Sequence, residues 1–178
     1  MTPENLEYRC LHEAGHVVAA YAAGDSVEFV DMDSNPQGAH TRVNRANRDN
    51  FSAKKLIACG GFAVEYVLFK RKLVTNPSGQ LMTPQEFMQS SMDNARIDKK
   101  MFCDAYIAED GARWAETLDT ELLDSEFKNF ALHEVVPHME SRWNDVEVIA
   151  RDLALKRYLS RAQIEELTSL RESRSLQI

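Results

Sequence analysis

Residues 11–24, which read LHEAGHVVAAYAAG, constrain the fold more than any other part of the sequence. Apart from two histidines and one glutamate, most of these residues are small or apolar, which is typical of a helix packed inside a protein. Thr2 and Pro3 suit the N-cap and the first residue of such a helix, and Gly24 suits its end. The sequence therefore predicts a long, buried helix near the start of the chain.

A β-hairpin and a second buried helix are expected to follow. Residues 26–44 alternate apolar and polar side chains around a turn at residues 35–38, which favours a small hairpin. Residues 51–72 carry apolar side chains at helical spacing. Gly60 and Gly61 lie inside this helix, where each costs roughly 1 kcal/mol relative to alanine. We therefore expect another backbone to pass close to them.

The second half of the sequence is predicted to be helical. Residues 73–90 look like an inserted loop, although the capping box TPQE favours a short helix from Pro84. Another helix is expected to begin at Ser90 or Ser91, and later residues show helical periodicity with a break at Pro137. The predicted fold class is therefore mainly α (α+β), with one small β-hairpin.

Composition limits the functional classes that fit this chain. Its 178 residues are expected to form a single domain, residues 1–178. The formal net charge of −7, without a dense cluster of Lys and Arg, argues against nucleic-acid binding. The three cysteines are far apart and form no C-x-x-C pair, so neither a disulfide framework nor a thiolate zinc site is expected. Because the sequence shows neither a signal peptide nor a membrane span, we expect a cytoplasmic protein that does not bind membranes.

The pattern H-E-x-x-H in the first predicted helix is typical of a zinc site with its catalytic base. His12 and His16 lie four residues apart, so both rings can point to one ion from one face of the helix. Glu13 is displaced by one residue and can take a proton from a water on the metal without replacing a ligand. By chance the composition would give only about 0.01 such patterns. A solvated helix face is the alternative, and the small residues around the pair argue against it.

A catalytic zinc ion usually has three protein ligands, so the motif requires a third residue from elsewhere. Three candidates stay open on the residues alone: Asp93 at a predicted helix start, Glu65 in the glycine-bearing helix, and His40 in the predicted hairpin. His133 and His138 are five residues apart with a proline between them, which does not fit the spacing of a helical ligand pair. We interpret these two as ordinary surface or packing residues.

Residues 8–24, YRCLHEAGHVVAAYAAG, resemble the start of the peptidase domain of FtsH-type ATP-dependent zinc metalloproteases, in which H-E-A-G-H is the motif of the metal ligands and the base. Four later segments are similar to parts of that domain in the same order. GAHTRVN resembles its return strand, and CGGFAVEYVLF resembles its G-G-R-A-A-E-E helix. SSMDNARIDKKM resembles the helix with the third aspartate ligand, and RDLALKRYLSRAQIEEL resembles its closing helices.

This resemblance implies a specific set of site residues. His12 and His16 become ligands of Zn²⁺, Glu13 the catalytic base, and Asp93 the third ligand. Glu65 becomes a helix partner close to the site, in the second shell or as an alternative ligand. The resemblance also implies that Gly60 and Gly61 let their helix approach the metal-binding helix, and that the edge strand of the hairpin pairs with an extended substrate.

The chain also departs from the family. Phe62 stands where the family usually has an arginine, Met92 stands where an asparagine commonly precedes the aspartate, and residues 73–90 look like an insertion. The sequence contains no G-x-x-x-x-G-K-[ST] phosphate loop and no membrane anchor. We therefore expect a peptidase domain without its ATPase motor.

The main hypothesis is a zinc metalloendopeptidase that hydrolyses peptide bonds in peptides or unfolded protein. Action alone, action with a separate ATPase, and assembly into a homo-oligomer all stay open. One alternative is a catalytically silent relative that works as a binding or adaptor protein, and Glu13 argues against it because a zinc-binding scaffold needs no base. A second is an acidic helical interaction protein with an incidental motif, which the small residues around His12 and His16 disfavour.

Overall fold

The computed structural model describes residues 1–35, 38–44, 49–110 and 120–175 and is mainly helical, with one small antiparallel sheet. This confirms the predicted fold class. The helices in chain order are α1 (Leu6–Ala22), α2 (Phe51–Ala58), α3 (Gly60–Lys70), α4 (Pro84–Asn94), α5 (Arg96–Asp110), α6 (Thr120–Phe130), the π-helix η2 (Ala131–Val135), α7 (Val136–Ser141), α8 (Trp143–Lys156) and α9 (Arg161–Ser175). The strands are β1 (Ser26–Asn35), β2 (Gly38–Asn44) and β3 (Tyr158–Ser160).

Helix α1 is the long buried helix that the sequence predicts, but it begins later than expected. Its N-cap is Asn5, whose side chain accepts a hydrogen bond from the Glu7 N–H, so the prediction of a cap at Thr2 is wrong. The physical reason is a turn before the helix, in which the Asn5 N–H donates to the Thr2 carbonyl at 3.0 Å. Gly24 follows the end of α1 with φ of +78°, as expected of a glycine after a helix C-terminus.

The sheet contains the predicted hairpin and one strand that the sequence did not reveal. β1 pairs with β2 in antiparallel fashion, and residues 36–37 of the predicted turn lie outside the described residues. β3 pairs with the other side of β1, which gives the order β2-β1-β3. The helical periodicity predicted for this part of the chain does not extend through β3, because Arg157 adopts a left-handed conformation at φ 62° and ends α8. Among the described residues, β2 therefore forms one open edge of the sheet.

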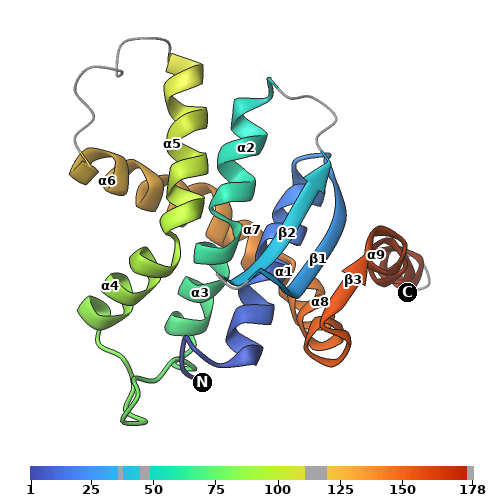
Figure 1. The fold of residues 1–178 in the computed structure, drawn as a ribbon, viewed down its shortest axis with the longest axis horizontal. Coiled ribbons are helices and arrows are strands. Elements are labelled where there is room, and N and C mark those ends of the chain that lie inside the picture. The colour runs from blue at the N-terminus through green and yellow to red at the C-terminus, as the bar shows by residue number, and fades with distance from the viewer. Residues whose placement is uncertain (36–37, 45–48, 111–119, 176–178) are drawn as a thin grey trace.

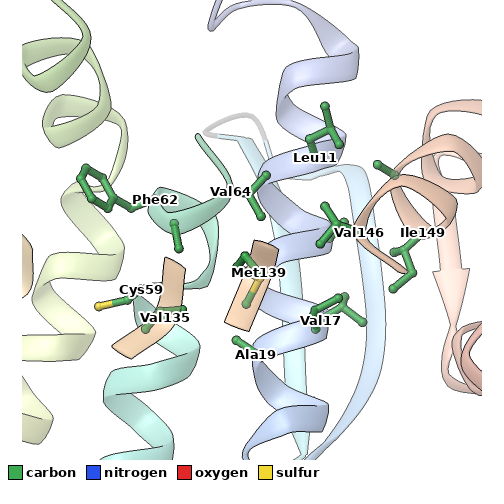
Figure 2. Packing of buried hydrophobic residues seen from close by; sticks show 14 of the residues in the cluster. Leu11, Val17, Ala19, Cys59, Phe62, Val64, Val135, Met139, Val146 and Ile149 are labelled. Carbon is green, nitrogen blue, oxygen red and sulfur yellow. The ribbon is translucent and has the colours of Figure 1, made fainter. Parts of the chain in front are cut away.

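Helix α1 lies at the centre of the core. It packs mainly against α3 and α8, and the sheet covers another part of its surface (Figure 1). Figure 2 shows Val64 of α3 on one side of α1, with Val146 and Ile149 of α8 on the other. All three side chains are at most 1 % exposed. The small residues of α1 therefore have the role that the sequence suggests, which is to let neighbours pack against it from several sides.

The closest of these contacts joins α1 to the start of α3. A Cβ atom at Gly15 would lie 2.4 Å from the carbonyl oxygen of Gly60, and one at Gly60 would lie 2.6 Å from the carbonyl oxygen of Gly15. Side chains do not fit at such distances, so the two backbones touch. This confirms the prediction that another backbone passes close to the paired glycines. The predicted single helix over residues 51–72 is divided at Cys59 into α2 and α3.

The region between α3 and α5 differs from the prediction in its helix boundaries. Thr83 and Glu86 form the predicted capping box, and α4 begins at Pro84. Ser90 and Ser91, however, lie inside α4 and do not start a new helix. The next helix, α5, begins five or more residues later than expected because α4 continues to Asn94.

Three smaller observations complete the fold. Pro137 lies in the first turn of α7, directly after η2, so the helix is interrupted next to the predicted break. Cys10, Cys59 and Cys103 are free thiols, as expected. Within the described part of the chain, no helix combines the length and the apolar character needed to cross a membrane.

Candidate metal centre

His12 and His16 come together because they occupy successive turns on one face of α1. Their Nε2 atoms lie 3.1 Å apart, and their ring planes are inclined by 72°. His16 is buried and His12 is nearly so, with 14 % of its side chain exposed. The rings therefore direct one nitrogen each to a common point, as the spacing of the motif predicts.

Asp98, in the first turn of α5, completes the group. Its Oδ2 atom lies 3.4 Å from Nε2 of His12 and 3.5 Å from Nε2 of His16. A tetrahedral zinc ion with bonds of about 2.0–2.1 Å has ligand atoms about 3.3 Å from one another. The three distances of 3.1, 3.4 and 3.5 Å fit that geometry, so one ion can contact all three atoms at once.

The remaining ring nitrogens of both histidines have partners that accept hydrogen bonds. Nδ1 of His12 lies 2.8 Å from Oε1 of Glu65, and Nδ1 of His16 lies 2.8 Å from the carbonyl oxygen of Ile57. Because both partners are acceptors, each Nδ1 carries the proton and each Nε2 presents a lone pair. Ligand histidines in metal sites are usually held by such partners. Two lone pairs and a carboxylate oxygen therefore converge on one point, an arrangement that suits a cation.

The charge balance of the group also favours positive charge at this point. Burial opposes charge on His12, but its contacts with Asp98 and Glu65 outweigh burial and raise the pKa of His12 well above its ordinary value. The pKa of His16 is raised as well, because Asp98 outweighs the effect of burial. For Asp98, burial is outweighed by His16 and His12, which hold its pKa well below the usual range. Protons therefore bind the metal-free group, and a divalent cation can replace them.

Aromatic packing holds α5, and with it Asp98, in this position. The ring of Phe102 on α5 packs edge-on against Phe127, with 5.5 Å between the ring centroids. Phe127 in turn packs against Phe62 of α3, at 5.4 Å. Phe62, which stands where the peptidases named in the resemblance usually have an arginine, is fully buried in this contact. An apolar bridge therefore connects the helix of Asp98 to the glycine-bearing helix.

Asp93, the third ligand implied by the resemblance, lies outside the group. It is exposed near the end of α4, where its Oδ2 atom accepts a hydrogen bond from Gln89 at 3.0 Å. The prediction placed Asp93 in the first turn of a helix, but α4 extends to Asn94 and Asp98 occupies that position in α5. The capping box at Thr83 could have revealed this, because a helix of ordinary length from there includes Asp93.

The other candidates for the third ligand also lie outside the group of His12, His16 and Asp98. Glu65 is buried in α3 and contacts Nδ1 of His12, so it lies beside the group of His12, His16 and Asp98 and is not a member of it. His40 is exposed on β2, with its ring 6.1 Å from that of Phe29. His133 is exposed and His138 is half-buried, in agreement with their interpretation as surface or packing residues.

Glu13, the predicted base, is buried next to the histidines and faces the sheet. Its Oε2 atom accepts a hydrogen bond from the hydroxyl of Thr41 on β2 at 2.5 Å. No pattern in the sequence indicates Thr41, because its contact with Glu13 depends on the packing of the hairpin against α1. This contact orients the carboxylate and joins the edge strand of the sheet to the candidate metal centre.

Gly61 is required by the position of His12. A Cβ atom at Gly61 would lie 2.3 Å from Nε2 of His12, so any other residue here would displace the ring. The pair of glycines therefore has two functions. Gly60 allows the two helices to touch, and Gly61 leaves space for a ligand ring.

Comparisons with protein families and with curated protein sequences give no match. No protein-family model matches the chain, and no curated protein sequence matches it at a significant level. The resemblance to FtsH-type peptidases therefore stays a prediction from the motifs quoted above, and the functional interpretation depends on the residues and their geometry.

Proposed function

We propose that this protein is a zinc-dependent metallopeptidase that hydrolyses peptide bonds in peptides or unfolded protein. The observation that carries the proposal is the convergence of His12 Nε2, His16 Nε2 and Asp98 Oδ2, with the opposite nitrogen of each ring held by an acceptor. Two imidazoles and one carboxylate suit zinc better than calcium or magnesium, which prefer oxygen ligands. Three protein ligands also match a catalytic site, because structural zinc sites usually have four.

The residues around the group fit the roles that hydrolysis requires. Zinc, when bound, acts as a Lewis acid and lowers the pKa of a water at its free coordination position. Glu13 follows His12 directly, and its carboxylate is oriented by Thr41. In the proposed reaction Glu13 takes the proton of the attacking water and passes it to the amine that leaves. Glu65 and Ile57 keep the ligand rings in the tautomer that binds metal.

The sheet supports a peptide as the substrate. β2 is an open edge in the described part of the chain, and Thr41 in this strand contacts the proposed base. An extended peptide can pair with the main chain of β2 and pass beside the metal centre, through hydrogen bonds that do not depend on its sequence. Such pairing requires an extended substrate, which favours peptides and unfolded chains over folded proteins.

The proposal includes the relationship to FtsH-type peptidases and a cytoplasmic location. The order of the motifs, the small residues of α1 and the position of Glu65 support the relationship. A separate ATPase and a homo-oligomer are compatible additions, and the test below uses the chain alone with substrates that need no unfolding.

Zinc content and cleavage of unfolded casein, measured together, test the proposal. We expect the purified protein to hold about one zinc per chain and to cleave, and Glu13→Gln to keep zinc while losing at least about 100-fold in rate. Glu7→Gln is the matched control, because Glu7 is an exposed glutamate of the same helix. Zinc binding without any cleavage in the parent protein would favour a silent binding or adaptor protein. A parent protein that binds no zinc at neutral pH contradicts the metal site itself.

A further inference from the structure

Behind the candidate metal centre, three buried polar groups lack ordinary partners. The hydroxyl of Tyr8, the hydroxyl of Ser91 and the Oε2 atom of Glu65 are inaccessible to solvent, and none has a hydrogen-bond partner among the described residues. Each of the three residues is only 1 % exposed. Buried polar groups without partners are costly. Three such groups in one region therefore need an explanation.

The chain brings these groups together from three helices. Tyr8 lies one turn before His12 on the same face of α1, Glu65 comes from the middle of α3, and Ser91 comes from α4. The other oxygen of Glu65, Oε1, lies 2.8 Å from Nδ1 of His12. Glu65 thus contacts the side of His12 that faces away from the metal position, and Tyr8 lies one helical turn before His12.

The pKa of Tyr8 is affected by both Glu65 and Ser91. Burial raises the pKa of the Tyr8 hydroxyl most strongly, and the carboxylate of Glu65 raises it further. Ser91 has the opposite effect and lowers this pKa. A carboxylate that accepts a hydrogen bond from the Tyr8 hydroxyl raises its pKa, and a serine that donates a hydrogen bond to the Tyr8 oxygen lowers it.

We propose that Tyr8 and Ser91 form a buried positioning network that holds Glu65, and through it the ligand ring of His12. In this network Ser91 donates to the Tyr8 oxygen, Tyr8 donates to Oε2 of Glu65, and Oε1 of Glu65 accepts from Nδ1 of His12. Tyr8 and Ser91 touch neither metal nor substrate and act only through Glu65. The inference rests on the proposed zinc site for its purpose, but the contact of Glu65 with His12 exists without metal.

The network has a consequence for His12 that simple packing would not have. A carboxylate fixed at both oxygens cannot rotate, so it keeps the Nδ1–H tautomer and the plane of the His12 ring. Loss of the Tyr8 hydroxyl leaves Oε2 of Glu65 buried and unpaired. The ring of Phe at this position would keep the packing, so only the hydrogen bond is removed.

Zinc affinity, measured by competition with a chelating dye, is the first test. We expect Tyr8→Phe to weaken zinc binding about two- to tenfold, the effect of one hydrogen bond, and Ser91→Ala to weaken it less. Glu65→Gln should weaken it about 10- to 100-fold. In that background the additional effect of Tyr8→Phe should fall below about twofold, because the two residues act through one connection. Tyr21→Phe and Ser90→Ala are matched controls that remove hydroxyls from the same two helices.

The ring ¹⁵N signals of His12 in metal-free protein give a second test that does not require zinc. We expect Tyr8→Phe to shift these signals, while Tyr21→Phe leaves them at the parent positions. If zinc binds the parent and both measurements on Tyr8→Phe and Ser91→Ala equal the parent values, the network is overturned while the zinc site stands. If the parent binds no zinc but the His12 signals shift in Tyr8→Phe alone, the network stands and the proposed function fails.

Discussion

Asp93 and Asp98 lie only five residues apart, yet they have opposite surroundings. Asp93 is exposed on α4, and Asp98 faces two imidazoles from α5 with 14 % of its side chain exposed. The sequence identifies His12, Glu13 and His16 because their relationship lies within one helix. The third residue of the candidate metal centre comes from a distant segment, so its identity depends on where α4 ends. No glycine or proline marks the end of α4 at Ala95, and the prediction placed this boundary too early.

The two aspartates offer a matched pair of substitutions. We expect Asp98→Asn to weaken zinc binding by more than about 100-fold, since even outer partners of metal ligands contribute about 10- to 100-fold. Asp93→Asn should change the affinity by less than about twofold, because its side chain is exposed and is hydrogen-bonded to Gln89, outside the group. Isothermal titration of metal-free protein with zinc measures both. Equal losses in the two variants would show that the ligand set given above is wrong.

At the scale of elements, predictions succeeded where a local pattern determines the structure. The capping box at Thr83, the hairpin and the close approach at Gly60 were all predicted from residue types that have a direct physical reason. β3 was missed because three residues are too few to show alternation, and its pairing with β1 spans more than 120 residues of sequence. The contact of Thr41 with Glu13 was missed because it depends on how the hairpin packs against α1.

The crossing of α1 and α3 predicts an unusual sign for a helical substitution. Glycine to alanine inside a helix normally stabilises by about 1 kcal/mol. We expect Gly60→Ala to destabilise the protein by roughly 2 kcal/mol or more, because the new methyl group meets the carbonyl of Gly15. Urea unfolding followed by circular dichroism measures the change, with Ser90→Ala as a helical control that should be near neutral. A stabilised Gly60→Ala protein would show that the two backbones are not in contact.

At the scale of the whole molecule, the metal centre joins segments from the first and second thirds of the chain. Metal-free protein must hold His12, His16 and Asp98 together with protons. The raised pKa values of the histidines stabilise the fold fully below their unfolded value near 6.5, and this contribution is lost as pH rises through their folded values. The lowered pKa of Asp98 acts in the opposite direction, since its contribution is lost as pH falls below about 4.

Thermal unfolding at several pH values therefore distinguishes the metal-free and zinc-bound forms. In EDTA, we expect a higher melting temperature near pH 5.5 than near pH 8.5, and zinc should raise the melting temperature most at pH 8.5, where protons no longer compete for the rings. Asp98→Asn should lose most of both effects, which separates them from the titration of other groups. A zinc effect that is larger at pH 5.5 than at pH 8.5 would contradict this account.

The position of β3 also has a consequence for synthesis of the protein. β1 leaves the ribosome well before residues 158–160, its second neighbour, because more than 120 residues separate the two strands. Until β3 is made, the nascent hairpin exposes hydrogen-bonding groups along its β1 side as well as its β2 side, a state in which strands readily join other chains. The β1 side of the hairpin is therefore open to such pairing while the intervening chain is synthesised.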